Sequence, residues 1–210
     1  MSATPERLKE RRHPMTSPLT RFALAACLAL AGTPALAQTS LSDAQILQSL
    51  QGFTDAAPAV TSQELRDQVK QHMAQYPGEE LTRPALAIRL DRLPQINTQI
   101  QFRLNSAIIE PSSYATLGAI ADAMHNPILH GYKFIVTGST DVTGSREYNL
   151  KLSQERADAV VKALSTTFNV SPSRLEAVGF GEEVLEDAKN PTSPINRRVQ
   201  IFTIGRTGQQ

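Results

Sequence analysis

A short apolar run, a turn of small polar residues and a long helical pattern follow one another between residues 132 and 168. Tyr132–Thr137 has the length and composition of a buried strand, and Gly138–Gly144 supplies residues that favour a turn. Apolar side chains then recur at helical spacing from Ser145 to Phe168. Those predicted to face inward are Leu152, Val160, Val161 and Leu164. A strand that leads through a turn into a helix constrains the fold, because the helix packs back onto the sheet that contains the strand.

The chain before this unit predicts one more strand and one more helix. Thr98–Leu104 alternates between apolar and polar residues, which indicates a strand. Its predicted inward residues are Ile100, Phe102 and Leu104. Pro111 suits the first turn of a helix, and Asn126-Pro127 would end it. The residues predicted on the buried face of that helix are Tyr114, Leu117, Ile120, Ala121 and Met124.

Two strand patterns follow the long helix and complete the predicted fold. They are Leu175–Gly179 and Val199–Ile204, and the polar stretch Glu182–Pro194 forms a loop between them. Strands and helices then follow in the order βαβαββ. We therefore expect an α/β (α+β) two-layer sandwich, in which helices pack on one mixed sheet. This domain should span residues 95–205, with a tail at residues 206–210.

Residues 38–94 are expected to form a helical lead-in and linker. Ser42–Gln45 and Thr61–Glu64 both resemble capping boxes, and each precedes apolar residues at helical spacing. Thr54–Ser62 has the composition of a linker, and Ala85–Leu90 is interpreted as a short strand. Two short helices bury little apolar surface, so the lead-in must lean on the main domain or on a protein partner.

Residues 1–37 resemble a secretory signal peptide. Phe22–Gly32 is an apolar run too short to span a bilayer, and Ala35-Leu36-Ala37 has the small-x-small pattern of a cleavage site. We therefore expect a mature chain that begins at Gln38 in the periplasm, whether translation starts at Met1 or at Met15.

Cys27 leaves a second interpretation of the N-terminus open. Leu24-Ala25-Ala26-Cys27 matches a lipoprotein box, which would tether the chain to a membrane through lipid. The apolar run continues past Cys27, which favours cleavage after Ala37. Cys27 is the only cysteine, so a chain cleaved there contains no disulfide.

The charge balance argues against nucleic acid as a partner. The net charge is +1, but residues 1–37 hold five basic and two acidic side chains. The remainder has 16 basic and 18 acidic residues, a net charge of −2. A near-neutral chain lacks the positive surface that binds phosphate backbones.

Asp141, Asn149 and Arg156 are the candidate binding residues. Asn149 and Arg156 are seven residues apart, so they lie on one face of the predicted helix, about 10.5 Å apart along its axis. Asp141 precedes the helix in the turn. A carboxylate and a guanidinium on a rigid frame suit a ligand with an ammonium and a carboxylate, such as a free amino-acid end.

Spacing alone leaves simpler roles open for the same residues. Asp141 could cap the helix, Arg156 could pair on the surface with Glu110, and Asn149 could be a solvated helix residue.

Several short motifs occur in a fixed order and carry a family resemblance. They are Phe102-Arg-Leu-Asn105-Ser-Ala107, Thr140-Asp141-x-x-Gly144, Asn149, Leu152-Ser153-x-x-Arg156-Ala157, Gly179-x-Gly181-Glu182 and Asn196-Arg197-Arg198-Val199. On these motifs residues 98–204 resemble the OmpA-like C-terminal domain, which is similar to the peptidoglycan-associated lipoprotein and to the periplasmic part of flagellar stators. The resemblance implies a non-catalytic domain that binds peptidoglycan non-covalently, through the diaminopimelate of the stem peptide.

The resemblance also implies roles for individual residues. Asp141 would bind the ligand's ammonium and Arg156 its carboxylate. The residues implied to surround them are Asn105, Thr140, Thr143 and Asn149. Of Arg197 and Arg198, one would border the pocket and the other would pack or pair elsewhere. No cofactor or metal is implied, and His125 and His130 have no further ligands near them in the sequence.

Two positions depart from the family pattern. Many members have His where Ser139 stands, and a Pro is common where Glu183 stands.

The expected function is to anchor the outer envelope, or a complex in it, to the cell wall. The main alternative is a structural adaptor whose residues 38–94 bind a protein partner in the envelope. An enzyme acting on the wall lacks a matched acid and base in the sequence.

Overall fold

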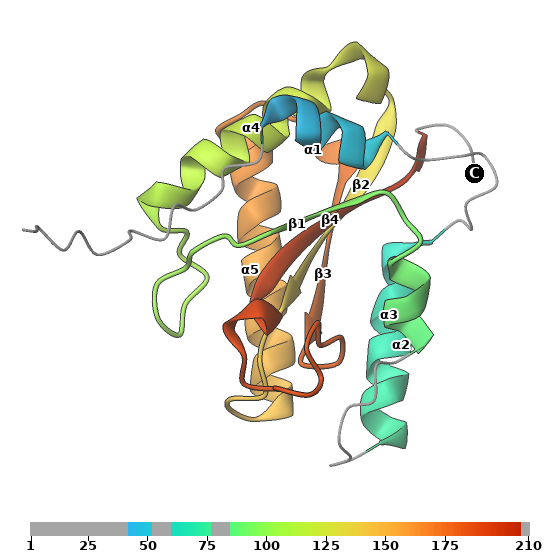
Figure 1. Ribbon diagram of the computed structural model, residues 1–210, viewed down its shortest axis with the longest axis vertical. Helices are drawn as coiled ribbons and strands as arrows, with labels where there is room; N and C mark the ends of the chain where they lie inside the picture. The colour runs from blue at the N-terminus through green and yellow to red at the C-terminus, as the bar shows by residue number, and fades with distance from the viewer. Residues whose placement is uncertain (1–41, 52–59, 77–84, 207–210) are drawn as a thin grey trace, which may run out of the picture. The chain divides into compact units, whose positions relative to one another are not determined.

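A mixed four-stranded sheet forms the centre of the protein (Figure 1). The computed structural model describes residues 42–51, 60–76 and 85–206. The strands are β1 (Gln95–Thr98), β2 (Tyr132–Ser139), β3 (Leu175–Gly181) and β4 (Arg198–Arg206). In space their order is β1-β4-β2-β3. β4 is antiparallel to both of its neighbours, whereas β2 and β3 are parallel.

Helices cover both faces of this sheet. They are α1 (Asp43–Leu50), α2 (Ser62–Gln75), α3 (Ala85–Leu90), α4 (Tyr114–His125) and α5 (Arg146–Thr166). Short 3₁₀ turns occur at Pro111–Ser113, Pro127–Leu129, Pro172–Arg174 and Pro194–Asn196. The side chains of β2 alternate between these two faces. Phe134 and Val136 belong to the core under α1, α4 and α5, whereas Ile135 belongs to the core under α2 and α3.

The predicted order βαβαββ is confirmed for β1, α4, β2, α5, β3 and β4. The long helix begins after Ser145, whose side chain accepts a hydrogen bond from the Tyr148 amide at 3.2 Å. Of the predicted inward residues of α4, Leu117, Ile120, Ala121 and Met124 are buried. Tyr114 is 39% exposed, because it occupies the first turn and its ring lies against Phe168 at the helix surface.

Two of the predicted strands are not observed at the predicted residues. Ala85–Leu90 is a helix, since its residues favour helices and Leu86, Ala87 and Leu90 pack together on one side. The first strand of the domain is Gln95–Thr98 rather than Thr98–Leu104. The chain leaves the sheet after Thr98, and Leu104 is 90% exposed.

A hairpin explains why the alternating pattern after Thr98 did not form a sheet strand. The Arg103 amide donates to the Ile108 carbonyl at 2.9 Å, and Phe102 and Ile109 form an isolated bridge. Asn105, at the turn, has a φ of 49°, which Asn tolerates better than most residues.

The lead-in helices lean on the main domain, which is one of the two alternatives that the sequence left open. Ser42 and Gln45 form the predicted capping box, and Thr61 accepts a hydrogen bond from the Glu64 amide at 3.1 Å. Buried residues Ile46 and Leu50 of α1 belong to the core beneath α4. The other face receives Leu65 and Val69 of α2. The predicted signal peptide and most of the predicted linker, Thr54–Ser62, lie outside the described residues.

Two glycines allow α5 to lie directly on the sheet. Gly138 of β2 and Gly179 of β3 stand opposite each other. A Cβ atom on Gly138 would lie 2.4 Å from the Ser153 carbonyl oxygen, and one on Gly179 would lie 2.4 Å from the Gln154 nitrogen. The Gln154 side chain accepts a hydrogen bond from the Gly179 amide at 2.8 Å and donates one to the Ala177 carbonyl at 3.3 Å.

Across the described ranges, no helix combines the length and the apolar character needed to cross a bilayer.

The Gly179→Ala substitution should lower the free energy of unfolding by about 3 kcal/mol, since the new methyl group meets rigid backbone of α5. Gly118→Ala is the control, because its Cβ would lie 3.3 Å from the Phe168 ring, which can shift, and alanine favours the helix. Urea unfolding followed by circular dichroism measures both. Equal effects of the two substitutions would contradict the close approach of α5.

Candidate functional site

The candidate site lies where the end of β2, the first half of α5 and the start of β4 meet. A cavity of about 250 Å³, here called the charged pocket, lies at this junction. Its walls are residues 99–102, Gly138 and Ser139 of β2, Arg156 of α5, and residues 194 and 197–199. Arg156 of α5 and Arg197, just before β4, make it an anion-attracting cavity.

Asp141 is held at the junction by two donors. The Thr143 amide donates to Oδ1 at 2.9 Å, and the Arg197 guanidinium donates to Oδ2 at 2.5 Å. Burial tends to raise the pKa of Asp141, but the bonds from Arg197 and Thr143 outweigh it and hold the pKa below its ordinary value. The carboxylate therefore stays ionised at neutral pH, 6% exposed, beside the pocket wall.

Arg156 reaches the charged pocket from the third turn of α5. Its Nε donates to the Ser106 carbonyl at 3.1 Å, and its guanidinium carbon lies 5.0 Å from the centre of the Phe102 ring. Burial lowers the pKa of this guanidinium and the charge of Arg197 lowers it further, whereas Tyr148 and, less strongly, Asp141 raise it. Its two terminal nitrogens make no hydrogen bond to the described part of the chain, so both can face a ligand.

The simpler roles considered for Asp141 and Arg156 are not the observed ones. Ser145, rather than Asp141, caps α5. Arg156 binds the Ser106 carbonyl, whereas Glu110 lies 3.8 Å from Arg103.

Asn149 is buried and holds the loop that carries Asp141. Its Nδ2 donates to the Asp141 carbonyl at 3.1 Å and to the Glu182 carboxylate at 2.6 Å. With 2% of its surface exposed, Asn149 is a support for the loop and not a wall of the charged pocket.

Of the remaining candidate residues, Thr140, Thr143 and Asn105 lie outside the pocket walls, whereas Arg197 is part of them. Thr140 is buried, and its amide donates to the Gly181 carbonyl at 2.8 Å. Thr143 and Asn105 are exposed at their turns. Arg197 and Arg198 both line the cavity, but the Arg197 side chain is 48% exposed and that of Arg198 only 5%. Ser139, where the family more often has His, is a buried wall residue.

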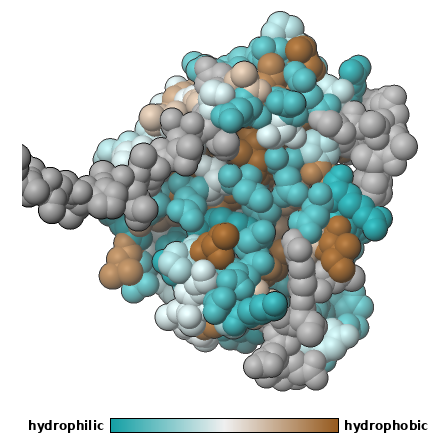
Figure 2. All heavy atoms as spheres, in the orientation of Figure 1, coloured by the Kyte–Doolittle hydropathy of each residue, from teal (hydrophilic) through white to brown (hydrophobic). Residues whose placement is uncertain are grey.

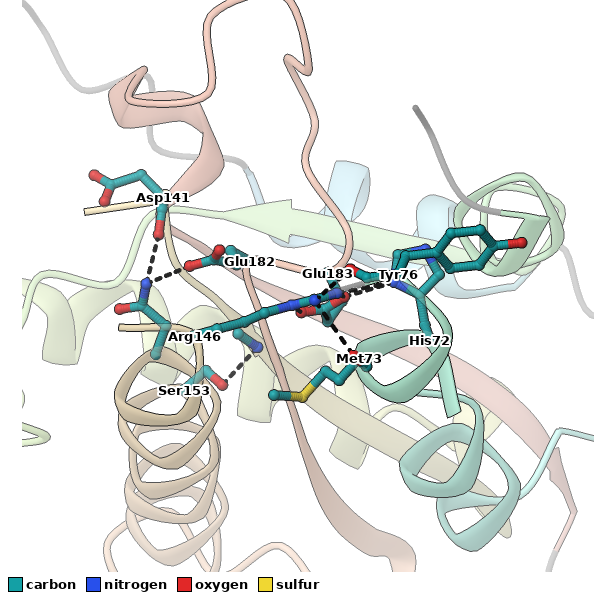
Figure 3. Close-up of polar contacts among 10 residues, drawn as sticks. His72, Met73, Tyr76, Asp141, Arg146, Ser153, Glu182 and Glu183 are labelled. Carbon is teal, nitrogen blue, oxygen red and sulfur yellow. Dashed lines mark hydrogen bonds and ion pairs between the residues drawn. The ribbon is translucent and has the colours of Figure 1, made fainter. Parts of the chain in front are cut away.

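A buried ion cluster that the sequence did not predict lies beside the site (Figure 3). Glu183 is 2% exposed and accepts from Arg146 at 2.5 and 2.6 Å, and His72 of α2 lies 2.6 Å from the same carboxylate. Arg146 also donates to the Tyr76 carbonyl at 2.7 Å. The unusual Glu183 was the available signal, but its partner His72 is 111 residues away.

Adjacent glutamates thus bind two residues in the first turns of α5. Glu182 holds Asn149, and Glu183 holds Arg146. Asn149 also holds the Asp141 loop, and Arg146 also contacts the end of α2. The same pair of glutamates therefore connects both the lead-in and the candidate site to the start of α5.

Comparison with known proteins places the similarity in the same region. Residues 101–200 match the family described as the OmpA family. Outer membrane porin F of Pseudomonas fluorescens is 35% identical over 108 residues, which cover 50% of this chain and 32% of the porin. The peptidoglycan-associated lipoprotein of Pseudomonas putida is 33% identical over 106 residues, which cover 50% of this chain and 61% of the lipoprotein.

Among solved structures, the peptidoglycan-associated lipoprotein from Burkholderia pseudomallei is 29% identical, with a TM-score of 0.42. The match covers 51% of this chain and 88% of that protein. The chain thus spans about a third of the porin and about three fifths of the Pseudomonas putida lipoprotein.

Replacing Glu183 by Gln should lower the free energy of unfolding by about 3 kcal/mol, because Arg146 loses its buried counter-charge. Glu64→Gln is the matched control. It breaks the more exposed pair between Glu64 and Arg89, so the loss should stay below about 1 kcal/mol. Urea denaturation at neutral pH measures both, and a Glu183→Gln protein as stable as wild type would refute this role.

The lowered pKa of Asp141 predicts an acid-dependent loss of stability. A carboxylate whose pKa is lower in the folded state stabilises the fold above its ordinary value of 3.8, and that contribution disappears as pH falls through the folded value. The difference in unfolding free energy between wild type and Asp141→Asn should therefore shrink as pH falls below about 4. Urea midpoints measured across this range test it, and parallel curves would contradict it.

Proposed function

We propose that the protein binds peptidoglycan non-covalently and anchors the envelope to the cell wall, because residues 101–200 match the OmpA family. The observation that carries this proposal is one cavity lined by two guanidinium groups, Arg156 and Arg197, with one ionised carboxylate, Asp141, bound to Arg197 beside it. The name of the Pseudomonas putida lipoprotein relative, peptidoglycan-associated, supports the same ligand class.

The proposed ligand is the free amino-acid end of diaminopimelate in the stem peptide. Its carboxylate would bind the terminal nitrogens of Arg156, a geometry that favours paired hydrogen bonds. Its ammonium would bind Asp141. A carboxylate has about four acceptor positions, so Asp141 can accept from the ammonium while it keeps its bonds from Thr143 and Arg197.

The chemistry of the site supports binding without catalysis. A general acid or base needs a pKa near the working pH. Asp141 is held ionised, and the arginines stay protonated, so these groups suit recognition of fixed charges. The relatives named outer membrane porin and peptidoglycan-associated lipoprotein support an envelope location, and we propose secretion to the periplasm.

The adaptor alternative receives less support from the structure. The apolar faces of α1, α2 and α3 are buried against the protein's own sheet, so they are not free for another protein. On the face shown in Figure 2, apolar side chains lie in separate small groups among hydrophilic residues. Ile88 and Tyr76 are the large apolar residues that the described lead-in exposes, at 52% and 44%.

Asp141→Asn and Arg156→Gln should each reduce binding of the full-length mature protein to purified sacculi by at least about tenfold. Each change removes one charge-assisted contact, and tenfold corresponds to about 1.4 kcal/mol. Co-sedimentation at several protein concentrations gives the apparent affinity.

Arg103→Gln is the control, because Arg103 lies on the neighbouring hairpin with its side chain 63% exposed and outside the charged pocket. It should sediment like wild type. Undiminished sedimentation of both site variants, each shown to be folded by circular dichroism, would sink the assignment of the pocket. If wild type fails to sediment, peptidoglycan binding itself is wrong.

A further inference from the structure

A second cavity of about 200 Å³ adjoins the charged pocket. The two cavities share two wall residues, Gln99 and Arg198. The other walls of this side cavity are Asn97 and Thr98 of β1, and Glu186 and Ile195 of the loop between β3 and β4. The two cavities are therefore neighbours.

The side cavity is electrically balanced, unlike the charged pocket. Arg198 donates to the Val184 carbonyl at 3.0 Å and lies 3.5 Å from the Glu186 carboxylate. Its side chain is only 5% exposed. Because these contacts offset its charge, the cavity has little attraction for a second anionic group.

The groups that the side cavity presents suit a neutral amide. Asn97 Oδ1 accepts from Gln200 at 2.6 Å, which directs the Asn97 NH₂ group away from Gln200. Thr98 and Gln99 add a hydroxyl and a second amide. Ile195, 47% exposed, supplies an aliphatic surface on the opposite loop. Amide donors and acceptors beside one aliphatic patch match a peptide bond with a small apolar side chain.

We propose that the side cavity is a second subsite, which binds the neutral peptide segment amide-linked to the amino-acid end in the charged pocket. This inference rests on the proposed function. One end of diaminopimelate in a stem peptide is free and the other is in amide bonds, so the peptide must leave the charged pocket over a neighbouring surface. The shared walls make the side cavity that surface.

Isothermal titration calorimetry with two probes tests the subsite. One probe is diaminopimelate, and the other is diaminopimelate coupled at one end to alanine through an amide bond. Wild type should bind the coupled probe at least about fivefold more tightly, because only that probe reaches the side cavity. Asn97→Ala and Ile195→Ala should reduce this gain to below about twofold and leave the affinity for diaminopimelate unchanged.

Ile128→Ala is the matched control, since Ile128 is 58% exposed and lies outside both cavities. It should keep the full gain. A gain that persists in Asn97→Ala and Ile195→Ala overturns the subsite, as does displacement of the coupled probe by a wall disaccharide that carries no peptide.

The two proposals fail in distinguishable ways. If diaminopimelate binds and the coupled probe binds no better, the subsite is wrong and the charged pocket stands. If only the coupled probe binds, and binds through Asn97 and Ile195, the subsite stands and the assignment of the charged pocket is wrong. If neither probe binds wild type, both proposals fall.

Discussion

The backbone contact between α5 and the paired glycines of β2 and β3 is the constraint on which the rest depends. Any side chain at Gly138 or Gly179 would enter the backbone of Ser153 or Gln154. With hydrogen there, the helix sits closer to the sheet than ordinary side-chain packing permits. This contact fixes the height and rotation of α5, and the buried face of the helix follows from it.

The same contact places the charged groups of the site. Ser153 lies against the sheet, Arg156 one turn later reaches the charged pocket, and Asn149 one turn earlier holds the Asp141 loop. Adjacent carboxylates then tie this end of α5 to the loop before β4 and to α2. The pocket is therefore built from positions fixed by backbone contact and buried charge, which limits how far Arg156 and Asp141 can separate.

Local patterns in the sequence predicted much of this arrangement. The apolar run of β2, the helical spacing of α5 and the stripe of α4 are each contained in one segment, so each could be found without the fold. The prediction of a strand at Ala85–Leu90 was wrong because a run of six mostly apolar residues fits a buried helix as well as a strand. The prediction of a sheet strand at Thr98–Leu104 was wrong because the alternation of apolar and polar residues does not reveal the hairpin turn at Asn105.

Long-range pairs account for what the sequence did not predict. Asp141 meets Arg197, 56 residues later, and the ion cluster at Glu183 joins α2 to the far end of β3. The family resemblance directed attention to Asp141, Arg156 and Arg197, and the structure puts Arg156 and Arg197 in one wall and Asp141 against them. The supporting role of Asn149 and the balanced charge of Arg198 depend on neighbours that only the fold supplies.

The Gln154 side chain covers part of the open edge of the sheet at β3, where another copy of the protein could otherwise add a strand. The Ala177 carbonyl receives bonds from Gln154 and Arg66, and the Gly179 amide donates to Gln154, so these backbone groups at the outer edge of β3 are already occupied. A strand from another molecule would have to displace side chains from α5 and α2 before it could pair there. Molecules crowded side by side are thus protected against sheet-to-sheet polymerisation through this edge.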